Sequence, residues 1–135
     1  MDQDAQTLET LKIFHYVFAG LTALGGCFPF IHLTVGIVIV TAGQTLTGAD
    51  QTPPPAFAGW LFIAFATAFI LLLWTLAALV FAAGRRLGQR RGRTFCMVVA
   101  GVLCAMVPMG TVLGVFTILT LQKPAVRVMF GEPSS

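Results

Sequence analysis

Charged residues divide the chain into three long uncharged stretches. No Asp, Glu, Lys or Arg occurs between Lys12 and Asp50, between Asp50 and Arg85, or between Arg93 and Lys123. Each stretch is longer than the roughly 20 residues that an α-helix needs to cross a hydrocarbon core about 30 Å thick. Lipid offers the backbone no hydrogen-bond partners, so helices are the expected form. The pattern therefore predicts an all-α, polytopic integral membrane protein.

The first uncharged stretch is too long for one crossing and contains a helix-breaking sequence. Gly25, Gly26 and Pro29 lie near its middle. Glycine is common just after a helix, and proline is common at the first position of the next one. The break predicts two helices, near residues 8–26 and 29–47, joined as a tight hairpin. One long helix kinked at Pro29 is the alternative, because membrane helices tolerate proline kinks.

Two further helices are expected near residues 57–84 and 94–121, which gives about four transmembrane helices in a single domain of residues 1–135. The last of them is interrupted by Pro108 and Gly110. Its length slightly favours one kinked span. The basic residues of the tail, residues 122–135, favour a re-entrant hairpin instead, because they would then lie in the cytoplasm.

Basic residues indicate which loop faces the cytoplasm. Five arginines cluster in residues 85–93, namely Arg85, Arg86, Arg90, Arg91 and Arg93. Cytoplasmic loops carry an excess of Lys and Arg, so this loop is expected inside and in contact with anionic lipid headgroups. The proline-rich loop 48–57 has no basic residue and is expected outside. Nucleic-acid binding, the other interpretation of a basic cluster, is not expected.

Composition favours the same environment. Hydrophobic residues make up 57% of the chain and charged residues 10%, whereas soluble domains average about 45–50% and about 25%. A soluble fold of 135 residues would bury too little surface to hide so many apolar side chains. The acidic start, from Met1 to Asp4, lacks the basic opening of a secretory signal, so we expect the first apolar segment to be retained.

Small residues four positions apart predict close helix packing. Gly110 and Gly114 form a GxxxG pair, and Ala64 with Ala68 forms a similar one. Such pairs let two helix backbones approach closely, within one chain or between chains. The stripe through Gly110, Gly114 and Thr117 is partly polar and would suit a pore lining. Threonine hydroxyls in helices, however, commonly bond to their own backbone.

The predicted membrane segments contain two candidate functional polar residues, His15 and His32, and their only Asp or Glu is Glu9, at the start of the first segment. Missing carboxylates argue against ion-coupled carriers and membrane hydrolases. Cys27, Cys96 and Cys104 have no metal-ligand spacing. No catalytic, cofactor-binding or metal-binding residues are therefore expected. Haem ligation by the histidines is an alternative, although their depths in the predicted helices differ by more than about 10 Å.

Three stretches carry a resemblance to known proteins: HYVFAGL at residues 15–21, FPFIHL at 28–33 and PMGTVLGV at 108–115. They resemble a group of small bacterial inner-membrane proteins that have no assigned function. The resemblance extends over nearly the whole chain. It implies a four-helix layout in a bacterial inner membrane, and it supplies neither an activity nor site residues.

These observations favour a non-enzymatic function. The leading hypothesis is a small integral membrane subunit that packs with itself or with a larger membrane complex. A pore or small carrier built from several copies is the second hypothesis, and a haem-binding redox subunit using His15 and His32 is the third. The expected location is the bacterial inner (plasma) membrane, with residues 85–93 in the cytoplasm. Expected partners are membrane lipids and another membrane protein chain, either a second copy or a different one.

Overall fold

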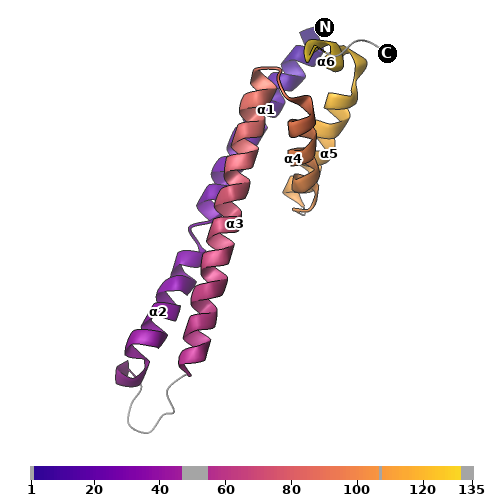
Figure 1. The fold of residues 1–135 in the computed structure, drawn as a ribbon. Helices are drawn as coiled ribbons and strands as arrows, with labels where there is room; N and C mark the ends of the chain where they lie inside the picture. Colours follow the sequence, from indigo (N-terminus) through magenta and orange to yellow (C-terminus); the bar gives the residue numbers. More distant parts are fainter. Residues whose placement is uncertain (1, 47–54, 107, 132–135) are drawn as a thin grey trace. The chain divides into compact units, whose positions relative to one another are not determined.

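The computed structural model describes residues 2–46, 55–106 and 108–131, and every regular element in them is an α-helix (Figure 1). The all-α prediction is therefore confirmed. The helices are α1 (Asp2–Gly25), α2 (Pro29–Leu46), α3 (Ala56–Gly88), α4 (Arg93–Cys104), α5 (Met109–Gln122) and α6 (Pro124–Met129). They form two compact units. The terminal unit is Met1–Leu21 with Leu76–Ser135, and the middle unit is Thr22–Thr75.

Two helical runs are long and apolar enough, by length and composition, to cross a membrane. They are Gln3–Gly43, with 41 residues, and Ala56–Gly88, with 33 residues. The shorter apolar helices α4 and α5 have 12 and 14 residues, or about 18 and 21 Å at 1.5 Å per residue. Neither reaches across a core of about 30 Å. The structure thus has two membrane-length runs and does not show the four expected spans.

The break in the first run does not produce the expected tight hairpin. The chain leaves regular helix between Gly25 and Pro29, but turn hydrogen bonds continue across the gap. The Cys27 N–H donates to the Leu24 carbonyl at 2.9 Å, and the Phe28 N–H donates to the Gly25 carbonyl at 3.1 Å. Such tight 3₁₀-like turns keep the chain advancing along the helix direction. The alternative of one long, interrupted helix is therefore the one that forms.

In the middle unit, α2 packs antiparallel to the first half of α3. A Cβ added to Gly59 would meet the Gly36 carbonyl oxygen at 3.0 Å, and one added to Gly26 would meet Trp74 Cδ1 at 2.6 Å. Gly26 thus lies beside Trp74, and Gly36 lies beside Gly59. The chain therefore advances along α3 on both sides of Pro29 and does not reverse there. The glycines let the two backbones approach closely.

In the terminal unit, α4 and α5 form a helical hairpin, so the slightly favoured single kinked span is wrong. Near the turn, Thr111 Oγ1 donates to the Cys104 carbonyl at 2.9 Å. One turn farther along, a Cβ added to Gly114 would meet the Ala100 carbonyl oxygen at 2.4 Å. The GxxxG pair that includes Gly110 is therefore used inside this chain, to pack α5 onto α4.

The hairpin packs with the first part of α1 and the end of α3 around two buried apolar clusters. One cluster contains Ala19, Leu76, Val80, Ala83, Val99 and Leu103. The other contains Leu8, Leu87, Cys96, Leu121 and Val126. On the α1–α3 side the helices approach closely, because a Cβ added to Gly84 would meet the His15 Cβ at 3.1 Å. Side chains of α1, α3, α4, α5 and α6 thus form these two clusters in the terminal unit.

The hairpin contact predicts opposite effects for two glycine substitutions. We expect Gly114→Ala to lower the free energy of unfolding by about 1–3 kcal/mol, because the new methyl group would collide with backbone atoms of α4. Gly101 on α4 is exposed, with nothing within 4 Å of an added Cβ. Gly101→Ala is expected to be neutral or stabilising by up to about 1 kcal/mol. Thermal unfolding in detergent micelles, followed by circular dichroism, measures both. Equal melting temperatures for the two variants would contradict the close packing.

Candidate functional site

The basic residues gather at one end of the terminal unit. All eight Lys and Arg residues of the chain belong to this unit. Lys12 lies against Gly88 at the end of α3, where an added Cβ would meet its Cδ at 2.7 Å. Lys123 Nζ lies 3.1 Å from Asp4 Oδ1 and so joins the end of α5 to the start of α1. Figure 1 shows the start of α1, α6 and the turn between α3 and α4 at this end.

The arginine cluster is more helical than expected. Arg85 and Arg86 belong to the last turn of α3, and α4 already begins at Arg93. The connecting turn includes Arg90, which has a positive φ of 52°. The Arg86 guanidinium lies 4.4 Å from the centre of the Phe95 ring, a cation–π contact between α3 and α4. Arg85, Arg86, Arg90 and Arg91 are all exposed. The cluster therefore presents its positive charge on the surface.

Arg93 connects the two arms of the hairpin at the same end. Its Nε donates to the Leu121 carbonyl at 2.8 Å, in the last turn of α5, where carbonyl groups have no partner within their own helix. Arg93 is only partly exposed. It therefore stabilises the base of the hairpin, in contrast to the four exposed arginines.

The two candidate histidines belong to different units and have different surroundings. His15 is fully buried in the terminal unit. Its Nδ1 lies 2.9 Å from the Leu11 carbonyl oxygen, and its Nε2 has no hydrogen-bond partner among the described residues. His32 is exposed in the middle unit, with the Phe28 and Phe62 rings at 5.6 and 6.3 Å between centroids. His15 is thus enclosed, whereas His32 is open to its surroundings.

The stripe considered as a pore lining lies inside the hairpin. Gly110, Gly114 and Thr117 are buried, and the glycines face α4. Thr117 Oγ1 donates to the Leu113 carbonyl of its own helix at 2.7 Å, as is common for threonine in helices. This stripe is therefore not on a free surface where several copies would line a channel with it.

The second pair of small residues has the opposite placement. Ala64 and Ala68 are both exposed on α3 in the middle unit, whereas Ala66 between them is 1% exposed. The alanine that packs inside the chain is thus Ala66. Ala64 and Ala68 form the alanine strip, a row of small exposed side chains on α3.

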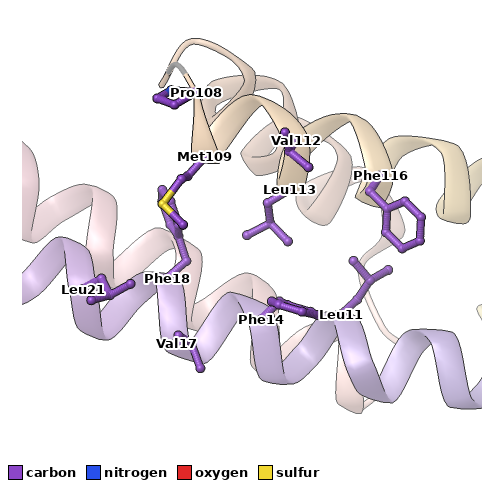
Figure 2. Close-up of a pocket in the computed structure, with 10 residues that line it drawn as sticks. All are labelled: Leu11, Phe14, Val17, Phe18, Leu21, Pro108, Met109, Val112, Leu113 and Phe116. Carbon is purple, nitrogen blue, oxygen red and sulfur yellow. The ribbon is translucent and has the colours of Figure 1, made fainter.

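A groove that the sequence analysis did not identify lies between α1 and α5 in the terminal unit (Figure 2). Its volume is about 450 Å³, and ten apolar side chains line it, along α1 from Leu11 to Leu21 and along the other wall from Pro108 to Phe116. The lining positions on α1 recur every three or four residues, which places them on one helix face. The sequence does not mark that face, because other faces of the same segment are also apolar.

Comparison with protein-family models, with curated proteins and with solved structures finds no match to this chain. Among the described residues, no group of three or more His, Cys, Asp or Glu side chains is placed to hold a metal ion. The candidate functional features of the described residues are therefore the basic end, the apolar groove and the exposed alanine strip.

The buried histidine gives a stability prediction. We expect His15→Leu to be neutral or to raise the free energy of unfolding by up to about 2 kcal/mol, because it removes a buried ring nitrogen that has no partner. Thr117→Val is the matched control. It removes a buried hydroxyl that has a partner, so it should cost about 1 kcal/mol. Thermal unfolding in detergent compares them. A larger loss for His15→Leu than for Thr117→Val would contradict this prediction.

Proposed function

We propose that this chain is a small, non-enzymatic integral membrane protein of the bacterial inner membrane that acts as a packing subunit, either with itself or within a larger membrane complex. The observation that carries the proposal is the exposure of the two membrane-length runs. Only 17% of the most apolar window of each is buried inside the fold. A core helix of a soluble protein is mostly buried, and exposed apolar patches of this extent mark membrane or protein contacts.

The proposed topology has two full crossings and one partial insertion. Gln3–Gly43 and Ala56–Gly88 cross in opposite directions, and the α4–α5 hairpin enters from the cytoplasmic side and returns to it. The gathering of every Lys and Arg at one end of the terminal unit supports this topology, because basic residues favour the cytoplasmic side. The 41-residue run is about 62 Å long, more than tilting alone accommodates, so its polar start would lie outside the hydrocarbon core and the break before Pro29 would allow a bend.

The exposed alanine strip supports the subunit role. Helices associate in lipid mainly through close packing, which small residues permit. The glycine pairs are occupied within the chain, Gly36 with Gly59 and Gly114 with α4. Ala64 and Ala68 are exposed instead. A helix of a second chain would find its closest approach to α3 along this strip.

The topology has a direct test in the sides of the chain ends. Tags at the N-terminus and at the C-terminus should be accessible only from the cytoplasm, and a cysteine at Ala56→Cys should react with a membrane-impermeant reagent from outside. A four-span arrangement with the same arginine orientation places both chain ends outside. Tags accessible from outside would therefore overturn the topology, and the Ala56 variant checks that the reagent reports sidedness.

The subunit role is tested by native mass spectrometry of the protein released gently from its own membrane. We expect a defined homo-oligomer or a stoichiometric foreign subunit. Ala64→Leu should weaken that assembly, because the larger side chain holds the partner helix away. Thr34→Leu, at an exposed position of α2 in the same unit, is the control and should leave the assembly unchanged. A monomer without any protein partner would overturn the subunit role.

A further inference from the structure

We propose that the groove between α1 and α5 binds one acyl chain of a phospholipid from the cytoplasmic leaflet, with the lipid phosphate at the basic end of the terminal unit. This proposal rests on the membrane location proposed above and adds a lipid-binding site to it.

The chemistry of the groove selects a hydrocarbon. Every side chain that lines it is apolar, so an occupant needs no hydrogen-bonding group there. Phe18 and Leu113 pack against the buried core and form the floor. Phe14 and Val112 are 57% and 71% exposed at the rims, so the groove opens sideways. Its volume of about 450 Å³ is within the roughly 300–1,000 Å³ of small-molecule sites.

The length of the groove matches one leaflet. From Leu11 to Leu21 the α1 wall rises about 15 Å at 1.5 Å per residue, half of a hydrocarbon core about 30 Å thick. The opposite wall ends at Pro108, where the hairpin turns. A transmembrane helix of a partner would run through both leaflets and would pass beyond this end. A lipid chain confined to one leaflet fits the groove over its whole length.

The basic residues at one end of the groove determine the orientation of the bound lipid. The Leu11 end of the groove points toward the basic end, and Lys123 follows Phe116 by seven positions on α5 and its C-cap. The Lys123 side chain is 53% exposed beside its partner Asp4, and an ammonium group has three donors. Donors therefore remain for a phosphate. At the other end, Leu21 and Pro108 lie far in sequence from any charged residue. The acyl chain thus points from the basic end toward the hairpin turn.

The site is tested by counting retained phospholipid in native mass spectra of protein taken from nanodiscs of phosphatidylglycerol and phosphatidylethanolamine in equal amounts. We expect one phospholipid per chain in the unmodified protein. Val112→Trp should lose most of it, because the indole occupies the groove. Leu119→Trp is the matched control on the same helix. Leu119 is 59% exposed and does not line the groove, so its variant should retain the lipid. Circular dichroism checks that both variants keep their helical content.

The position of the lipid phosphate is tested separately. Lys123→Gln should lower the preference for phosphatidylglycerol over phosphatidylethanolamine by about fivefold, the effect of one basic residue near an anionic surface. Asp4→Asn should raise that preference, because it frees Lys123 from its partner. An unchanged or reversed preference in both variants would overturn the phosphate position.

The outcomes separate this proposal from the proposed function. Equal lipid retention in the Val112 and Leu119 variants would overturn the acyl-chain site and leave the membrane topology unaffected. A change in oligomeric mass for Val112→Trp, without a change in bound lipid, would show that a protein helix occupies the groove. If the tags and the Ala56→Cys variant do not show a membrane-spanning protein, both proposals are overturned.

Discussion

Close approach of helix backbones at glycine is the interaction on which both units depend. In lipid, apolar side chains gain little by leaving their surroundings, so helices associate through packing and a few hydrogen bonds. The middle unit makes this contact between Gly36 and Gly59, and the terminal unit makes it between Gly114 and the backbone of α4 at Ala100. A methyl group at any of these positions would separate the helices. In the terminal unit, two buried apolar clusters add the packing of α1 and α3 to this contact.

The two helix breaks show where prediction from sequence succeeded and where it failed. Both lie in apolar segments and both combine glycine with proline, so local composition located them but did not tell a bend from a reversal. The difference lies in the residues farther away. Gly110 and Gly114 follow the second break, and their partners Ala100 and Leu103 precede it, so the chain folds back on itself. After the first break, the small residue Gly36 has its partner on α3, at Gly59.

The candidate site was less predictable than the helices. Uncharged stretches are visible in the sequence because charge is costly in lipid, and this is why the all-α class and the apolar segments were predictable, although the first segment was expected to form a hairpin. The groove is not visible, because a segment that is apolar on all sides does not reveal which face packs and which remains open. Thr117 and the GxxxG pair suggested a pore lining for a similar reason. The burial of the glycines is decided by contacts with α4 that sequence spacing does not specify.

The groove itself follows from the way α5 divides its surface. The glycine face of α5 is occupied by α4, so the side turned toward α1 carries the bulky residues Met109, Val112 and Phe116. These cannot approach α1 as closely as glycine approaches α4. At the base, Leu8 of α1 and Leu121 of α5 share a buried cluster and bring the helices together. Toward the hairpin turn the bulky residues of α5 keep the two helices farther apart, and the space between α1 and α5 stays open. A hairpin held by small residues on one face therefore leaves an apolar groove on the other, and in a membrane the lipid beside it is the nearest material that fits.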